Sequence, residues 1–154
     1  MIKVNVLISN KNWKKHIKNP AQYLKKRLNK LNKKEIFFKK RKIEFSLLLS
    51  GKKEIRNINY KFRKKSKSTD ILSFPFYNLK ELKKLLKSNK MFYLGDVIIN
   101  LDKIYPKYKN EKLKNNFNKL WIHGLLHLIG NRHKLNRDFI KMNKLEKRFY
   151  NFIN

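Results

Sequence analysis

The sequence contains no cysteine, and its 154 residues include only four glycines, three prolines and 10 acidic residues, against 41 lysines and arginines. Without cysteine the chain has no disulfide bonds and no thiolate ligands, so a bound metal would need nitrogen or oxygen ligands. No apolar run is long enough for a membrane span or a secretory signal. These absences predict a cytoplasmic protein that does not insert into a membrane. The hydrophobic content of 41% is enough for a globular core.

The formal net charge is +31, which predicts a polyanionic partner. Lysines and arginines that neutralise phosphates gain affinity by releasing condensed counterions. Part of the charge has another explanation, because lysine is abundant together with Asn, Ile, Phe and Tyr, a bias that AT-rich codons produce without selection for binding. Lysine also outnumbers arginine, although arginine is the better bidentate phosphate ligand. The remaining charge favours nucleic acid over a protein or a membrane as the partner.

Hydrophobic periodicity predicts a single α+β domain that spans residues 1–154. Strands are expected at residues 2–8, 43–50, 69–76 and 92–100. Helices are expected at residues 21–32, 52–62, 79–86, 101–105, 111–129 and 136–152. Residues 79–86 would connect the last two strands as a hairpin, and Pro75 marks an edge or an end of its strand. We therefore expect a mixed sheet of about four strands packed against several helices, with a C-terminal helical region that carries the site described next.

The stretch from Trp121 to His133, WIHGLLHLIGNRH, carries three of the four histidines of the chain. His123 and His127 are one helical turn apart, so their rings leave the same face and can share a cation. Gly130 can take the left-handed conformation that ends a helix, which would bring His133 back toward the other two rings. Three neutral nitrogen ligands with a fourth position open are typical of a catalytic zinc site. Ligand type, helical phase and the glycine turn together favour metal binding over a chance spacing.

One position separates this stretch from the zinc-peptidase pattern HExxHxxGxxH. Gly124 stands where those peptidases have the glutamate that acts as general base. A chain without that glutamate retains the Lewis acid but lacks the proton acceptor. A metallopeptidase therefore remains an alternative only if another carboxylate takes the place that Gly124 leaves.

Two other acids, Asp70 and Asp96, lie at the start of one predicted strand and within the next. Each could accept a hydrogen bond from a ligand histidine and so fix its tautomer. Each could equally stabilise a turn, because Thr-Asp and Gly-Asp are common turn pairs. The residues alone leave both roles open.

A cation held by three neutral histidines keeps its full double charge, which favours a phosphodiester as the bound group. Arg63 is the candidate to stabilise that phosphate, because it stands just before the strand that begins near Asp70. Lys64, Lys65 and Lys67 follow it and are candidates for RNA binding. A solvated basic loop is the alternative for this segment.

Taken together, these segments resemble the YbeY family of bacterial metal-dependent endoribonucleases. The family signature HGxLHLxGYDH is matched by HGLLHLIGNRH at residues 123–133, and TDVLSFP by TDILSFP at residues 69–75. Shorter matches lie in the same order: an Asn with a following Tyr-Arg, the LGDI element, and a Met-x-x-x-Glu motif. In this chain they correspond to Asn59, Phe62-Arg63, residues 94–97, Met142 and Glu146.

The resemblance implies an α+β fold in which His123, His127 and His133 hold one Zn²⁺ per chain and Arg63 contacts the phosphate. Arg63 and His123 are then the catalytic candidates. It also implies an RNA substrate, with a role in small-subunit (16S) ribosomal RNA maturation and ribosome quality control, and the ribosomal small subunit as a partner.

The chain departs from the family signature immediately before His133. The Tyr-Asp pair of the family is Asn131-Arg132 here. Arg132 makes the pocket more positive and joins the RNA-binding candidates. The leading hypothesis is a zinc-dependent, single-strand-directed endoribonuclease. The alternative is a ribosome-associated RNA-binding assembly factor with weak or no nuclease activity.

Overall fold

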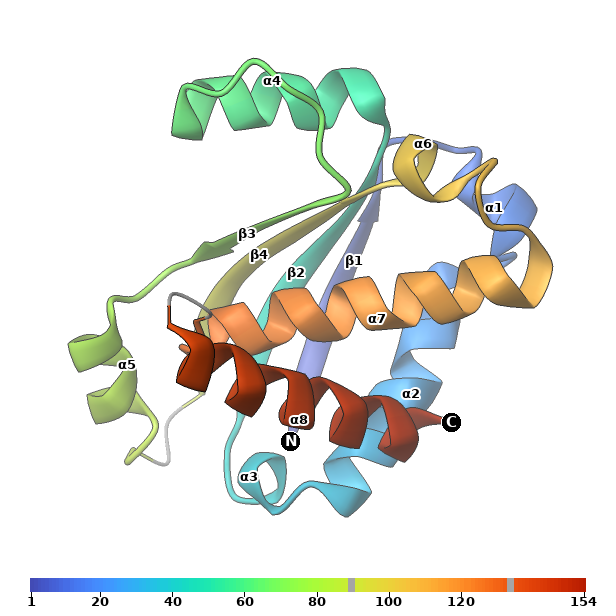
Figure 1. Cartoon of the computed structure of the whole chain (residues 1–154). Coiled ribbons are helices and arrows are strands. Elements are labelled where there is room, and N and C mark those ends of the chain that lie inside the picture. The colour runs from blue at the N-terminus through green and yellow to red at the C-terminus, as the bar shows by residue number, and fades with distance from the viewer. Residues whose placement is uncertain (89–90, 133–134) are drawn as a thin grey trace.

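The computed structural model describes residues 1–88, 91–132 and 135–154. The expected α+β fold with a four-stranded mixed sheet is confirmed (Figure 1). The strands are β1 (Ile2–Ile8), β2 (Ile43–Ser50), β3 (Ile71–Pro75) and β4 (Phe92–Asn100). The helices are α1 (Trp13–His16), α2 (Pro20–Lys34), α3 (Ile36–Lys39), α4 (Lys52–Arg63), α5 (Leu79–Leu85), α6 (Leu101–Ile104), α7 (Asn110–Leu128) and α8 (Asn136–Ile153).

The strands lie in the order β1-β2-β4-β3. β1 pairs with β2 and β2 with β4 in parallel, whereas β3 and β4 are antiparallel. The expected hairpin is therefore present, with Ser73 opposite Val97 and Phe74 opposite Asp96. β3 is an edge strand that ends at Pro75, in agreement with the lack of an N–H donor on proline.

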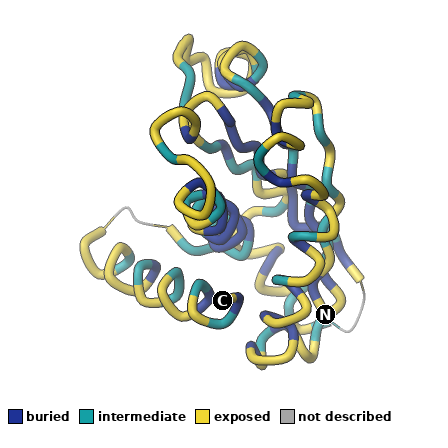
Figure 2. Tube along the Cα trace, turned by 90° about the vertical axis from the view of Figure 1, so that its right-hand side faces the viewer, coloured by how far each residue is buried: buried dark blue, intermediate teal, exposed yellow. Residues whose placement is uncertain are grey.

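The two faces of the sheet differ in what covers them. α2, α7 and α8 lie on one side, where α2 contacts β1 and α7 contacts β3 and β4 (Figure 1). The main core lies between these helices and the sheet and includes Trp13 and Trp121, both 0% exposed. Figure 2 shows buried residues gathered in this layer, with exposed residues on the outward-facing sides of the helices.

On the other face, α4 packs against one end of the sheet (Figure 1). Ile55 of this helix packs against Leu72 and Ile98, with Leu48 and Phe74 partly buried around them. Alternation along β1 leaves residues such as Lys3 and Leu7 exposed on the side away from the main core. Within the described residues, α4 thus covers only part of this second face.

Two short helices, α1 and α3, were not expected from the sequence. Each has four residues, too few for a periodic pattern. Tertiary contacts hold them instead: Trp13 of α1 is fully buried and its Nε1 donates to the carbonyl oxygen of Ser50 at 3.0 Å. Phe38 of α3 is also 0% exposed. Among the described residues, no helix is long and apolar enough to cross a membrane.

Candidate metal and phosphate site

The last turns of α7 bring His123 and His127 together. Their Nε2 atoms are 3.0 Å apart, and both side chains are partly exposed. Their neighbours on the opposite side of the helix, Trp121, Leu125 and Leu128, are buried against the core, which fixes the rotation of α7. The four-residue spacing therefore places both rings on the open face, as the sequence predicts.

Gly130 ends α7 in the way expected from the sequence. Its φ is +91°, and its N–H donates to the carbonyl oxygen of His127 at 3.0 Å. The N–H of Asn131 reaches the carbonyl oxygen of Leu126 at 2.9 Å. These two bonds form a Schellman motif, which turns the chain sharply after the second histidine. His133, the third predicted ligand, lies outside the described residues.

Both histidine rings are oriented through Nδ1. Nδ1 of His127 lies 3.0 Å from the carbonyl oxygen of Asn131, and Nδ1 of His123 lies 2.6 Å from Oε1 of Glu146. A carbonyl oxygen and a carboxylate only accept, so in both rings Nδ1 carries the hydrogen and Nε2 presents a lone pair. This is the tautomer of a histidine that ligates through Nε2.

Two Nε2 lone pairs 3.0 Å apart repel each other unless a cation or a proton lies between them. Two nitrogens at this separation can share one zinc ion, because zinc–nitrogen bonds are about 2.0–2.1 Å long. The described part of the chain holds no group of three or more histidines, aspartates and glutamates that could bind a metal by itself. The geometry of His123 and His127 thus fits a metal site that needs at least one further ligand.

The histidines open into a pocket of about 400 Å³. It is formed by the ends of α4 and α7, by one side of β3 along its length, and by the turn after α7. Its lining residues are Arg63, Ile71, Ser73, Pro75, His123, His127, Asn131 and Arg132. The structure therefore brings Arg63 from a distant segment of the sequence to the predicted histidines, and Arg132 joins them from the turn that directly follows α7.

Arg63 is held by two contacts on β3. Its Nη2 donates to the carbonyl oxygen of Ser73 at 2.9 Å, and its guanidinium lies 5.2 Å from the ring centroid of Phe74. With Arg132 it gives the pocket two permanent positive charges, and none of the described residues that line the pocket is acidic. This charge suits a phosphate group.

The lysines predicted to bind RNA lie in the exposed loop after α4. Lys64, Lys65 and Lys67 are exposed and do not line the pocket. Lys64 ends α4 in the left-handed conformation, with a φ of +56°. This loop adds positive charge beside the pocket rather than within it.

Asp70 and Asp96 have local partners in the structure. Oδ1 of Asp70 accepts from the Thr69 hydroxyl at 3.0 Å and from the Ile71 N–H at 2.9 Å. Asp96 accepts from the Tyr93 hydroxyl at 2.6 Å, and burial, then this hydrogen bond, raises the pKa of Tyr93. Their hydrogen bonds in the described residues do not link either carboxylate to a histidine.

Glu146 is the carboxylate that contacts a site histidine. It lies on α8 one turn after Met142, which is 2% exposed and anchors the helix. The N-terminal part of α8 lies beside the end of α7 (Figure 1), which brings Glu146 to His123. In the sequence, only the Met-x-x-x-Glu spacing pointed to this residue.

Gly124 allows α7 to pack closely on the sheet. A Cβ atom at this position would lie 2.6 Å and 2.9 Å from the two methyl groups of Val97, and 3.1 Å from Cδ1 of Ile71. A glutamate in its place would therefore point into the core rather than toward the pocket. The steric environment explains why the peptidase general base is absent from this stretch.

Comparison with known proteins identifies the family of this chain. The family described as endoribonuclease YbeY matches residues 7–154. The chain belongs to the YbeY endoribonuclease family. The membership expected from the motifs is thereby confirmed, and the enzyme class expected from the sequence agrees with the description of the family.

Curated relatives carry the same description. An endoribonuclease YbeY of Pelagibacter ubique is 39% identical over 156 residues, which cover 99% of this chain and 97% of the relative. An endoribonuclease YbeY of Ehrlichia canis is 30% identical over 148 residues, which cover 95% of this chain and 88% of the relative. A solution structure from Thermotoga maritima shares the fold, with a TM-score of 0.61 at 20% identity over 99% of this chain and 89% of that chain.

Proposed function

We propose that residues 1–154 form one zinc-dependent endoribonuclease domain that cleaves single-stranded RNA in the cytoplasm. Its substrate is the RNA of the small ribosomal subunit, in 16S maturation and ribosome quality control. Membership of an endoribonuclease family supports the reaction class. The observation that carries the proposal is the pair of Nε2 atoms 3.0 Å apart in a pocket that also contains Arg63 and Arg132.

The metal would be held by His123, His127 and His133, one ion per chain. The tautomers of the first two rings suit zinc, because both Nδ1 atoms are engaged and both Nε2 atoms face each other. Zinc accepts three histidine nitrogens and leaves a position for another group. A divalent cation there supplies Lewis-acid polarisation of a phosphoryl oxygen.

Arg63 orients the phosphodiester. A guanidinium has five N–H donors, so the bond to Ser73 leaves donors for phosphate oxygens. The contact with β3 also fixes the side chain before RNA binds, which reduces the entropy lost on binding. Arg132 also lines the pocket and adds a second positive charge. Together the two arginines stabilise the negative charge that increases during phosphodiester cleavage.

A ribosome-associated RNA-binding assembly factor with weak or no nuclease activity is the second candidate. The exposed basic loop of Lys64, Lys65 and Lys67 favours it, because these side chains lie outside the pocket. They can bind RNA phosphates without taking part in cleavage.

The test compares cleavage of single-stranded and double-stranded RNA by the zinc-loaded protein and by His127→Ala. We expect cleavage of the single strand, reduced at least about 100-fold by the substitution because a metal ligand is lost. His16→Ala is the matched control, since His16 packs against Tyr105 away from the pocket. Unchanged cleavage by His127→Ala would contradict the proposal. Salt-dependent binding without any cleavage would favour the second candidate.

A further inference from the structure

Aromatic side chains lie in a row on the partly open face of the sheet. The row consists of Phe62 at the end of α4, Phe74 on β3, Phe76 just after β3, and Tyr93 on β4. The ring centroids of Phe62 and Phe74 are 5.4 Å apart, and those of Phe76 and Tyr93 are 6.2 Å apart. Phe62 is 64% and Phe76 68% exposed, so the core does not account for these two rings.

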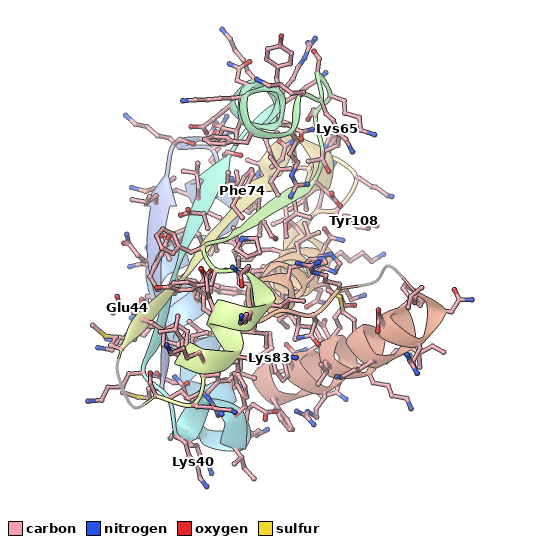
Figure 3. The ribbon with its side chains drawn as sticks, turned by 90° about the vertical axis from the view of Figure 1, so that its left-hand side faces the viewer. Lys40, Glu44, Lys65, Phe74, Lys83 and Tyr108 are labelled. Atoms are coloured by element: carbon pink, nitrogen blue, oxygen red, sulfur yellow. The ribbon has the colours of Figure 1, made fainter. Side chains whose placement is uncertain are left out.

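This aromatic row lies on the opposite side of β3 from the pocket. Ile71, Ser73 and Pro75 line the pocket, and strand alternation turns Phe74 to the other face. Figure 3 shows Phe74 on the sheet close to α4. Arg63 joins the two sides, because it lines the pocket and its guanidinium lies 5.2 Å from the Phe74 ring centroid. A strand bound at Arg63 can therefore continue over the sheet edge onto the row.

Cations accompany the rings. Nζ of Lys61 lies 5.5 Å from the Phe62 centroid, and Arg63 lies over Phe74. Among the described residues, two acids are paired with the row. Asp96, opposite Phe74, accepts a hydrogen bond from the Tyr93 hydroxyl, and Glu44 of β2 lies opposite Tyr93. Exposed rings bordered by lysine and arginine are typical of surfaces that stack single-stranded bases and hold their phosphates.

We propose that the aromatic row is a stacking platform for unpaired bases of the RNA strand whose phosphodiester lies in the pocket. The proposal rests on the proposed function for the identity of that strand. Stacking needs a base whose face is accessible, and bases inside a duplex are already stacked on each other. The platform therefore selects single strands, and it tolerates sequence variation because every base presents a π face.

The test measures RNA affinity rather than cleavage. The variant Phe62→Leu with Phe76→Leu removes the two most exposed rings, and Phe62→Tyr with Phe76→Tyr keeps them aromatic. Phe152→Leu is the matched control, because Phe152 also has a lysine over its ring, with Lys34 Nζ at 5.8 Å. The probes are a labelled unstructured RNA oligonucleotide and its abasic counterpart, which keeps the phosphates. Fluorescence anisotropy is read at low temperature, with gel electrophoresis to confirm intact RNA.

We expect the double leucine variant to bind the normal oligonucleotide about tenfold more weakly, as the loss of base stacking predicts. Its affinity for the abasic oligonucleotide should equal that of the unchanged protein. The tyrosine variant and Phe152→Leu should bind both probes normally. A double leucine variant with undiminished affinity for normal RNA would overturn the proposal, and would leave the row as a surface for another partner. An equal loss of affinity for the abasic oligonucleotide would also overturn the proposal, because that probe has no bases to stack.

The outcome does not depend on cleavage. If the protein binds RNA in this pattern but cuts none, the proposed nuclease function fails and the platform stands. If it cuts RNA through His127 but the ring substitutions leave affinity unchanged, the platform fails and the nuclease function stands. Thermal unfolding of each variant establishes that the measured protein is folded.

Discussion

At the scale of single residues, the site depends on which nitrogen of each histidine carries the hydrogen. The contacts of Nδ1 with Glu146 and with the Asn131 carbonyl determine this for His123 and His127. Glu146 does so with a carboxylate, which fixes the orientation of the ring that it contacts. We therefore propose that Glu146 is a positioning residue for His123, one of the three proposed metal ligands.

Glu146→Gln tests this role. The amide keeps the size of the side chain but removes its charge, so we expect zinc affinity to fall about 10- to 100-fold. Competition with a chelating dye measures the change. Glu111→Gln is the control, because Glu111 is an exposed glutamate paired with Lys114. Equal zinc affinities in the Glu146→Gln variant and the unchanged protein would show that the carboxylate does not position the ring.

Gly124→Ala tests the close packing of α7 on β4. The added Cβ would lie 2.6 Å from a Val97 methyl, and we expect the free energy of unfolding to fall by about 1–3 kcal/mol. Urea denaturation measures it. The double variant Gly124→Ala with Val97→Ala removes the clash. Its loss of unfolding free energy should therefore be smaller than the sum of the losses in the two single variants. Additive losses would contradict this explanation of Gly124.

The residues of the site differ in how far the sequence predicts them. His123 and His127 follow from helical spacing, and Gly130 from the conformational freedom of glycine, because both are local properties. Arg63 followed from its position among motifs, and the structure does place it in the pocket. Glu146 could not be assigned a partner, because its contact with His123 joins two residues that are 23 positions apart and lie on different helices. That contact depends on tertiary packing.

At the scale of elements, the end of α7 controls the path toward the third predicted ligand. Gly130 has a φ of +91°, and a Cβ there would lie 2.9 Å from Leu79 of α5. The turn therefore depends on glycine for its conformation and for its packing.

Gly130→Ala should lower the free energy of unfolding by about 1–2 kcal/mol, the usual cost of a left-handed alanine. It should also weaken zinc binding, because the turn lies between His127 and His133. Urea denaturation and zinc titration measure the two effects. Gly130→Asn serves as a graded control, since asparagine tolerates positive φ better than alanine. If alanine changed neither quantity, the turn would not determine the metal site.

The longer elements matched their predicted bounds within about two residues, because each has a clear period and local end signals. α7 and the parallel strand β2 are examples. α1 and α3 were missed because contacts such as Trp13 with Ser50 hold them. The insertion of β4 between β2 and β3 was also not predicted, since strand order depends on contacts between distant segments.

At the scale of the whole molecule, we expect the net charge of +31 to combine side chains that bind RNA with side chains that only reflect composition. Salt dependence separates them, because each phosphate contact with a single strand contributes about −0.7 to the slope of log affinity against log salt. We expect Arg132→Ala to make the slope shallower by about 0.7. Lys83 is an exposed lysine of α5 (Figure 3) that does not line the pocket, so Lys83→Ala should leave the slope unchanged. An equal change of slope in the two variants would mean that the positive charge binds RNA without a defined site.

The central claim is that one zinc ion is held by three histidines of this chain. X-ray absorption at the zinc edge of the purified protein tests it most directly, together with zinc content per chain. We predict one zinc per chain, with three imidazole nitrogens at about 2.0–2.1 Å, and one nitrogen fewer or no zinc in His127→Ala. A protein that retains no zinc, or zinc whose coordination is unchanged by His127→Ala, would contradict the claim.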